Sequence, residues 1–377
     1  MLSYWEKQSL LQYDYIIVGS GIVGLSAAIA LKEKTENSRV LVLEREILPT
    51  GASTKNAGFA CVGSLTEILA DLQTMDTNAV VDLVKMRYEG LQLLRQRLGD
   101  AAIGYRENGS YELISSHEEW ALHKMEDVNT ILESFFPQKA FTVATDKLAD
   151  FGFNRTAVKA VVSNTYEGEL DTGKMMRALI HLALKLGVEI KTGATVSRVE
   201  DFRSSVNVIV PHHTLKEELV FTARKLIICT NAFTQSLLGM DDLTPGRGQV
   251  LITAPVPGLR FKGIYHFHEG YYYFREIDGR VLFGGGRQLD FKGETTTAFE
   301  YNDRIQHELE ALLRTVILPD QPFTIEDRWT GIMAFGKTKQ PVIKHYSENI
   351  VLGVRMGGMG VAIGSKVGEQ LADMVKG

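Results

Sequence analysis

The stretch that decides the fold is Tyr13-Asp14-Tyr15-Ile16-Ile17-Val18-Gly19-Ser20-Gly21-Ile22-Val23-Gly24, followed by the alanine-rich segment 25–34. The run 13–18 is rich in β-formers and predicts a short strand, whereas 25–34 predicts a helix. Gly19 permits the tight turn, Gly21 lets the backbone approach a pyrophosphate, and Gly24 allows close helix–strand packing. The helix start adds N–H donors and a positive dipole. This order predicts a dinucleotide site that includes Gly19, Ser20, Gly21, Ile22, Val23 and Gly24.

A second predicted strand, 39–43, ends at Glu44. An acid about 20 residues beyond the glycines stands where a carboxylate accepts hydrogen bonds from ribose hydroxyls. A carboxylate would repel a 2′-phosphate, which argues against NADP. A glycine pattern alone occurs by chance before surface helices, but here strand, turn, helix, strand and acid occur in order. We therefore place Glu44 and its neighbour Arg45 in the predicted site.

The segment Gly51-Ala52-Ser53-Thr54-Lys55-Asn56-Ala57-Gly58-Phe59 is small and polar without periodicity, and it predicts a loop. Its N–H groups, hydroxyls, lysine and amide could hold further phosphate and flavin edges. The alternative is a solvent loop without a ligand. The residues predicted to bind the cofactor here are Ser53, Thr54, Lys55, Asn56 and Ala57.

With this loop, the sequence resembles the D-amino-acid oxidase, glycine oxidase and sarcosine oxidase superfamily of FAD-dependent amine oxidoreductases. Its members follow the glycine fingerprint and acid with a Gly-x-Ser-x-x-Asn-x-Gly type loop, matched here by Gly51, Ser53, Asn56 and Gly58. The resemblance covers nearly the full chain and implies FAD as the cofactor. Sarcosine oxidases attach FAD through a cysteine in the C-terminal third, where this chain has none, so we expect non-covalent FAD.

Later segments extend the resemblance in the same order. A helix over 173–186, a strand from 187, a β-meander over 206–220 and a strand over 223–232 are predicted. The resemblance implies that Val196 holds the adenine through its backbone and that the Thr230-Asn231 turn approaches the cofactor. Near the C-terminus, glycines before a helix suit the flavin N1/C2 edge, where reduction places negative charge, although a tight helix start needs no ligand. The predicted residues here are Gly331, Gly357, Gly358, Met359 and Gly360.

The remaining segments predict a second, discontinuous domain. Residues 65–150 are predicted helical, with amphipathic helices over 79–98 and 116–136. Residues 234–327 carry a strand over 249–253, a hairpin of 270–276 and 280–283 around Asp278-Gly279, and a helix over 298–313. We predict an α/β fold, α+β overall: a Rossmann-like FAD-binding domain (1–64, 151–233 and 328–377) and an antiparallel-sheet-plus-helix substrate domain (65–150 and 234–327).

Only one dinucleotide fingerprint is present, so the substrate itself is expected to reduce the flavin. The Gly-Asp-Ala-Ala-His type motif of flavin hydroxylases does not occur. The resemblance implies oxidation of an amine or amino acid, with hydride transfer to flavin N5, hydrolysis of the imine, and oxygen or another electron acceptor. Alternatives are a dehydrogenase of a non-amine, such as glycerol 3-phosphate or a hydroxy acid, and a flavoprotein subunit that needs a partner.

The substrate contacts are predicted from one strand and a few arginines. Period-2 alternation puts Tyr271 and Tyr273 on one face, and in glycine-oxidase-like members a tyrosine near Tyr271 binds a carboxylate. The family's Trp-x-Gly-x-Arg-Pro motif, whose arginine clamps the substrate carboxylate, has Met333 at the arginine position here. Either Arg287, Arg328 or Lys337 substitutes, or the substrate is an amine without a carboxylate. The predicted catalytic residues are Tyr271, Tyr273, Arg287 and Arg328.

Composition limits the remaining classes. The chain has 377 residues, 45% of them hydrophobic, and 41 basic against 46 acidic residues give a net charge of −5. This indicates a globular protein of about two domains without the basic footprint of a nucleic-acid binder, which also disfavours a tRNA-modifying flavoenzyme. Two cysteines predict neither a disulfide framework nor a metal site. No leader or membrane-spanning apolar run is apparent, so a cytoplasmic protein without a transmembrane segment is expected.

Overall fold

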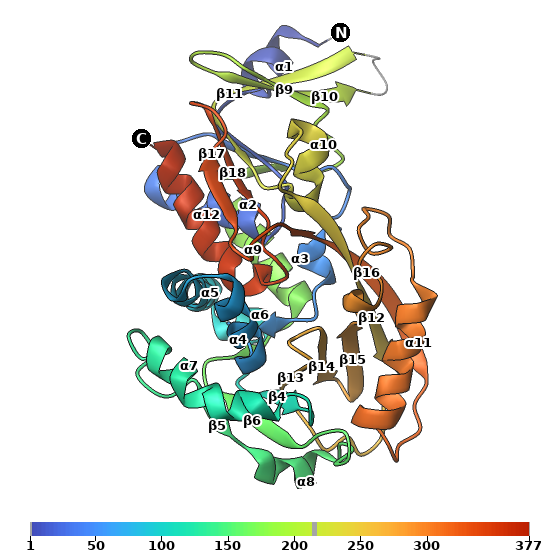
Figure 1. Cartoon of the computed structure of the whole chain (residues 1–377). Helices are drawn as coiled ribbons and strands as arrows, with labels where there is room; N and C mark the ends of the chain where they lie inside the picture. Colours follow the sequence, from blue (N-terminus) through green and yellow to red (C-terminus); the bar gives the residue numbers. More distant parts are fainter. Residues whose placement is uncertain (1, 213–216, 377) are drawn as a thin grey trace.

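The computed structural model describes residues 2–212 and 217–376, and within them the strands form two large sheets. The first sheet occupies the upper half of Figure 1, and the second runs across its lower half from β16 and β12 on the right to β6 and β5. A short pair, β3 (Phe59–Ala60) with β7 (Gly168–Glu169), lies apart from both. This mixed α/β architecture is the predicted fold class.

The first sheet is built around buried parallel strands, as the nearly continuous apolar run before Gly19 predicts. β1 pairs in parallel with β11 on one side and with β2 on the other, and its core residues Ile16 and Ile17 are fully buried. Its strands, in spatial order, are β17 (Val342–His345), β18 (Ile350–Val354), β11 (Glu217–Ile228), β1 (Gln12–Val18), β2 (Val40–Leu43) and β8 (Glu189–Lys191). The predicted β-meander is present as β9 (Arg198–Asp201), β10 (Val206–His212) and β11, while residues 213–216 lie outside the described part of the chain.

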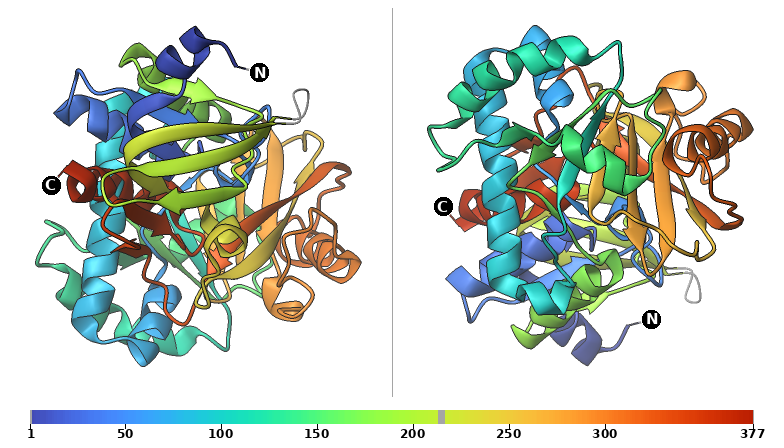
Figure 2. Two further views of the ribbon diagram at one scale, coloured as in Figure 1. Left: turned by 90° about the horizontal axis from the view of Figure 1, so that it is seen from above. Right: turned by 90° about the horizontal axis from the view of Figure 1, so that it is seen from below.

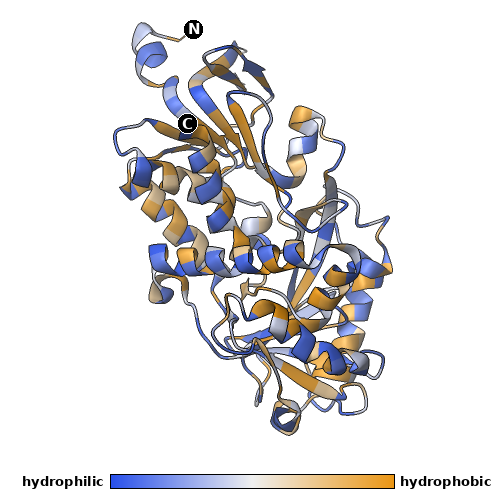
Figure 3. Cartoon of the chain, turned by 60° about the vertical axis from the view of Figure 1, so that its left-hand side comes forward, coloured by the Kyte–Doolittle hydropathy of each residue, from blue (hydrophilic) through white to orange (hydrophobic). Residues whose placement is uncertain are grey.

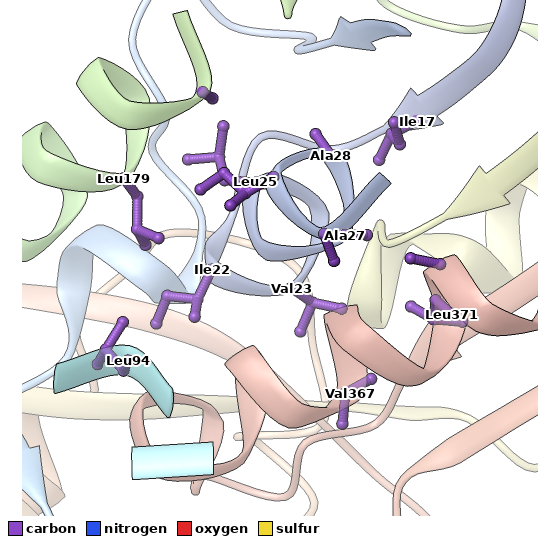
Figure 4. Close-up of a cluster of buried hydrophobic side chains, with 14 of the residues drawn as sticks. Ile17, Ile22, Val23, Leu25, Ala27, Ala28, Leu94, Leu179, Val367 and Leu371 are labelled. Atoms are coloured by element: carbon purple, nitrogen blue, oxygen red, sulfur yellow. The ribbon is translucent and has the colours of Figure 1, made fainter. Parts of the chain in front are cut away.

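Helix α2 (Ile22–Lys34) is the centre of the first core. It lies against α12 (Gly360–Lys376), with α5 (Thr77–Leu98) and α9 (Thr172–Lys185) beside it, as the labelled side chains in Figure 4 show. Gly368 permits the close approach of α12, because a Cβ there would lie 2.6 Å from the Ala27 backbone nitrogen. Burial on all sides explains why α2 carries apolar and small residues instead of one apolar stripe.

The second sheet is antiparallel except where β13 pairs in parallel with β4. Its order is β16 (Ile325–Phe335), β12 (Thr244–Thr253), β15 (Arg280–Gly285), β14 (Tyr272–Ile277), β13 (Ile264–Phe267), β4 (Ser110–Ile114), β6 (Ala160–Asn164) and β5 (Phe141–Val143). The predicted hairpin around Asp278-Gly279 is present as β14 and β15. Helix α11 (Asp303–Leu312) covers one face of this sheet, on the right of Figure 1.

The other helices are short or lie at the edges of the two sheets. Figure 2 shows the long α5 running along one side of the molecule, and Figure 3 shows hydrophobic and hydrophilic residues alternating along the helices, as expected for elements with one buried face. The remaining helices are α1 (Tyr4–Ser9), α3 (Ala52–Lys55), α4 (Leu65–Thr74), α6 (Asp100–Ile103), α7 (Met125–Leu132), α8 (Leu148–Phe151) and α10 (Thr234–Leu238).

Several predicted helices start or end elsewhere because polar side chains cap them. Asp76 accepts a hydrogen bond from the Ala79 amide, so α5 starts at 77, and Asn302 caps α11, which starts at 303 instead of 298.

The predicted helix over 116–136 is wrong as one element. A 3₁₀ segment over 119–124 precedes α7, which ends at 132, and Asn129 exchanges hydrogen bonds with the Phe141 backbone of β5.

The strand pairing differs from the predicted division of the chain at three places. β4 and β5 are strands within 65–150, which was predicted helical. β6 falls in the predicted FAD-binding segment 151–233 but pairs with β4, and residues 328–335 of β16 pair with β12. The sheet pairing therefore assigns 160–164 and 328–335 to the second sheet.

Arg275 ties the two halves together at a buried junction. Its guanidinium donates to the carbonyls of Leu170 (2.7 Å) and Gly58 (3.2 Å), and it lies 3.5 Å from the Glu169 carboxylate. Arg275 is 5% exposed, so these contacts offset the cost of burying its charge. The junction fixes β14 against the Gly58 segment, and residues on both sides of it line one cavity.

Candidate active site

A cavity of about 790 Å³ is lined by residues of both sheets and of the loops that precede α2, α3 and α12. It contains most of the residues predicted for the site, and four predicted residues do not line it: Ser20, Gly24, Thr54 and Arg328. The predicted residues that line it are Gly19, Gly21, Ile22, Val23, Glu44, Arg45, Ser53, Lys55, Asn56, Ala57, Val196, Thr230, Asn231, Tyr271, Tyr273, Arg287, Gly331, Gly357, Gly358, Met359 and Gly360.

The glycine turn forms a close cradle at the start of α2. Gly19 has a φ of +104°, a conformation that favours glycine. A Cβ on Gly24 would lie 1.9 Å from the Gly19 carbonyl oxygen, so only glycine allows α2 to start there. A Cβ on Gly21 would lie 2.8 Å from Ser53 Oγ, and that hydroxyl accepts a hydrogen bond from the Ile22 amide. The N-terminus of α2 thus faces the cavity with room for a phosphate.

Glu44 is held in place at the end of β2. Its Oε2 accepts hydrogen bonds from the Ser20 amide (3.1 Å) and from Ser20 Oγ (2.7 Å), and its Oε1 accepts from the Glu46 amide (3.2 Å). Ser20 therefore orients the acid instead of lining the cavity. The remaining lone pairs of this fixed carboxylate are available to ribose hydroxyls.

Replacement of Glu44 by glutamine is expected to weaken FAD binding about tenfold, because one amide hydrogen-bond donor would face the Ser20 amide and a charged acceptor is lost. The measurement is FAD affinity of the apoprotein by quenching of FAD fluorescence. Glu46→Gln is the matched control, since that carboxylate is half-exposed beside Arg45, and a change of less than about twofold is expected. Equal losses in both variants would contradict this role for Glu44.

The loop after Gly51 is fixed by its own polar side chains and contains the short helix α3. Asn56 Oδ1 accepts from the Gly58 amide and from Thr172 Oγ1, while its Nδ2 donates to the Ser53 carbonyl. Trp329 Nε1 donates to the Lys55 carbonyl at 2.9 Å. Thr54 instead donates to the Gly51 carbonyl and does not line the cavity. The loop therefore presents Ser53 and Lys55 from a rigid base.

Two further features suit the two ends of FAD. The Arg45 guanidinium lies 3.8 Å from the ring centroid of Phe233, and both residues line the cavity, as Val196 does. Before α12, Gly357 and Gly358 have φ of +56° and +86°, and the first turn of this long helix follows directly. The positive end of a helix dipole at the start of α12 would stabilise negative charge on the flavin ring of FAD. Together with the phosphate cradle, the residues present fit FAD.

The part of the cavity around Arg287 is bounded by aromatic side chains. Its guanidinium carbon lies 4.1 Å from the Phe335 centroid and 5.1 Å from the Phe291 centroid. Burial lowers the pKa of Arg287 from its usual value, which Tyr271 and Glu294 partly oppose. Its Nε has no hydrogen-bond partner, and no ion pair joins it to a carboxylate of residues 2–212 or 217–376.

The two other cations predicted as substitutes for the missing clamp lie elsewhere. Arg328 contacts Gln306 and lies 2.5 Å from a carboxylate oxygen of Glu310, both on α11. This position does not fit a direct contact with substrate. Lys337 does not line the cavity, and its amide donates to Asp242. Among the cations predicted to replace the clamp, only Arg287 lines the cavity.

Sequence reasoning missed a polar group at the same end of the cavity. Glu67 of α4 lies 3.3 Å from Lys339 and 3.7 Å from Arg87, and both Glu67 and Lys339 line the cavity. Burial alone would raise the pKa of Glu67, but the two cations lower it to about 2. His266 of β13 also lines the cavity. No local pattern marks Glu67 or Lys339, because α4 and the segment around Lys339 are distant in sequence.

Two features are absent from the described part of the chain. Within residues 2–212 and 217–376, no group of three or more histidine, cysteine or acidic side chains is arranged to hold a metal ion. In the same ranges, no helix has the length and apolar character needed to cross a membrane. Both cysteines are free, and Cys61 is buried.

Known proteins resemble this chain over nearly its full length. The bifunctional protein ThiO/ThiG of Synechocystis is 24% identical over 379 residues, covering 96% of this chain and 51% of that protein. This chain thus spans about half of that relative. The mitochondrial L-2-hydroxyglutarate dehydrogenase of Caenorhabditis briggsae is 21% identical over 356 residues, covering 89% of this chain and 78% of the enzyme.

Solved structures share the fold. L-proline dehydrogenase from P. horikoshii superimposes with a TM-score of 0.78 at 15% identity, covering 97% of this chain and 93% of that one. Glycine oxidase from Bacillus cereus superimposes with a TM-score of 0.75 at 18% identity, covering 97% of each chain. The sequence profile of the DAO family, described as FAD dependent oxidoreductase, matches residues 14–374. With the phosphate cradle, the fixed acid and the helix start in place, this chain belongs to the DAO family of FAD-dependent oxidoreductases, whose cofactor is FAD.

Proposed function

We propose that this protein oxidises a small amine that carries a carboxylate. The observation that carries the proposal is Arg287, a half-buried cation on the cavity wall without a carboxylate partner in the described residues. Gly246 leaves space for it, because a Cβ there would lie 3.0 Å from the guanidinium carbon. A planar guanidinium in such a site binds a carboxylate through paired hydrogen bonds.

The residues around Arg287 orient the substrate and exclude water. Tyr271 lies close enough to act on the charge of Arg287, Tyr273 lines the same cavity, and Phe291 and Phe335 flank the guanidinium. When bound, FAD supplies the two-electron oxidation of the carbon–nitrogen bond, and the imine product hydrolyses in water. The chain itself holds the reacting carbon in place, which needs no general base. Non-covalent binding of FAD is part of the proposal, since both cysteines have a raised thiol pKa through burial.

A second candidate is oxidation of a 2-hydroxy acid. One relative bears the name L-2-hydroxyglutarate dehydrogenase, and Arg287 would hold the carboxylate of a hydroxy acid equally well. Both candidates share the anion site and differ in the group that is oxidised.

The test is anaerobic bleaching of the flavin near ~450 nm by a panel of substrates. The panel contains glycine, sarcosine, D- and L-amino acids, 2-hydroxy acids, glycerol phosphate and polyamine derivatives. Bleaching by amino acids is expected, and bleaching by hydroxy acids alone would select the second candidate. Bleaching only by amines without a carboxylate would overturn the role of Arg287. Admission of air then shows whether oxygen or another acceptor reoxidises the flavin.

A further inference from the structure

A second groove, lined by basic side chains, lies between α9 and the segment where α5 ends and α6 begins. Its volume is about 490 Å³, and its basic lining residues are Arg97, Lys174, Arg177, His181 and Lys185. Within the described part of the chain, no acidic residue lines this basic groove, and none of its lining residues also lines the cavity described above. The basic groove is therefore a separate candidate binding site.

Four of these basic side chains form one row along α9. Positions 174, 177, 181 and 185 follow one another at three or four residues, so their side chains share one face of the helix. The row is about 16 Å long, because a helix rises about 1.5 Å per residue. Leu179 points toward α2 in Figure 4 and is buried, whereas all four residues of the row are exposed. The row therefore lies on the outer face of α9.

The stability of α9 does not explain this row. Lys185 in the last turn suits the negative end of the helix dipole, but Lys174 in the first turn does not, and it repels Arg177 three residues later. Lys174 lies 3.7 Å from Asp171, and Arg97 lies 2.6 Å from Glu33. No carboxylate within 2–212 or 217–376 forms an ion pair with Arg177 or Lys185. Cations that oppose local helix stability in this way indicate a binding surface.

The floor of the basic groove is apolar. It contains Leu98 and Ala102 on one side and Ala178 and Leu182 of α9 on the other. Leu98, Ala178 and Leu182 are partly buried and pack against the core around α2, while the basic side chains of α9 are exposed at the rim. A charged rim around an apolar centre is the arrangement of a protein–protein interface.

Charge and shape decide which occupant fits the basic groove. The chain as a whole carries a net charge of −5, so an acidic partner is drawn to this face in preference to the rest of the surface. Nucleic acid fits less well, because none of the described lining residues is aromatic and able to stack on a base. A flat membrane surface does not reach apolar side chains at the floor of a groove. A groove beside a helix, with apolar residues at its floor, suits an amphipathic helix.

We propose that the basic groove binds an acidic amphipathic helix of a partner protein. Apolar side chains of that helix pack on Ala178 and Leu182, and its carboxylates pair with Lys174, Arg177 and Lys185. This inference does not depend on the proposed function, because the basic groove and the cavity are built from different residues.

The test measures binding of a rhodamine-labelled acidic peptide to the FAD-loaded protein by fluorescence anisotropy. The peptide is an amphipathic helix with leucine and alanine on one face and glutamate beside them, and a second peptide carries glutamine in place of each glutamate. Arg177→Glu is expected to weaken binding of the acidic peptide at least about tenfold. This variant is expected to fold, because it places an acid three residues after Lys174 and four before His181, spacings that stabilise a helix. Ala178→Gln fills the floor without a change of charge and is expected to weaken binding at least about fivefold.

Lys139→Glu is the matched control. It makes the same change in net charge at an exposed lysine that lies 2.8 Å from Glu126 and does not line the basic groove, and a change of less than about twofold is expected. The inference is overturned if the wild type does not bind the acidic peptide, binds the glutamine peptide equally well, or loses affinity through Arg177→Glu but not through Ala178→Gln. Binding of phosphatidylserine vesicles in place of the peptide, or self-association that Arg177→Glu abolishes, would also overturn it, because the occupant would then be a membrane or a second copy of the chain.

Discussion

Replacement of Arg287 by methionine is expected to lower kcat/KM for the carboxylate-bearing substrate by at least about 100-fold, mainly through KM. The guanidinium is half-buried between Phe335 and Phe291, where a hydrogen-bonded charge pair is screened by little water. Methionine keeps much of the side-chain volume and removes the charge. The measurement is the concentration dependence of anaerobic flavin reduction, together with the flavin content of the variant.

The matched control for Arg287 is Arg328→Met. Both arginines were predicted from the sequence as possible clamps, but Arg328 is paired with Glu310 on α11 and does not line the cavity. We expect Arg328→Met to change kcat/KM by less than about threefold and to act on stability instead. A large loss in the Arg328 variant with a small one in the Arg287 variant would reverse the assignment.

The second large effect is expected on stability, from removal of a buried carboxylate beside the second sheet. Glu294 is fully buried and accepts hydrogen bonds from Arg247 Nε (2.9 Å), Arg247 Nη2 (2.8 Å), Gln249 (3.0 Å) and Asn302 (2.8 Å). Glu294→Leu leaves the Arg247 charge without its counterion. The expected loss is about 3–5 kcal/mol of unfolding free energy, measured by urea unfolding at a fixed FAD concentration.

An exposed pair of the same residue types provides the control. Arg280 and Glu326 lie 2.7 Å apart, and their side chains are 30% and 46% exposed. Glu326→Gln is expected to cost about 0–1 kcal/mol because water replaces the lost contact. Equal costs for the two substitutions would contradict this account.

The stabilisation by Glu294 is expected to depend on pH. Burial alone would raise the pKa of Glu294, but hydrogen bonds from Arg247, Gln249 and Asn302 lower it below its usual value. The contribution of Glu294 to stability is therefore present at neutral pH and is lost as the pH falls through the folded-state pKa.

The sequence alone predicted many of the residues that line the cavity. Gly19, Gly24 and Glu44 lie in adjacent strand and helix ends, and their function follows from local geometry. The glycine pattern alone would not suffice, but together with the strand, the helix, the second strand and the acid in order it predicts a phosphate cradle. The family resemblance then extended this prediction to Val196, Asn231 and Gly358, which line the same cavity.

Only the tertiary structure decided which polar side chains face the substrate end. Arg287 and Arg328 are equivalent in sequence terms, but α11 supplies Glu310 and Gln306 to Arg328, while Gly246 of β12 leaves room for Arg287. The sequence could not show that His266 is buried beside Phe59 and Glu67, because these residues lie about 200 positions away. The physical reason is that a charge acquires its role from the partners that burial brings to it, and contacts distant in sequence choose those partners.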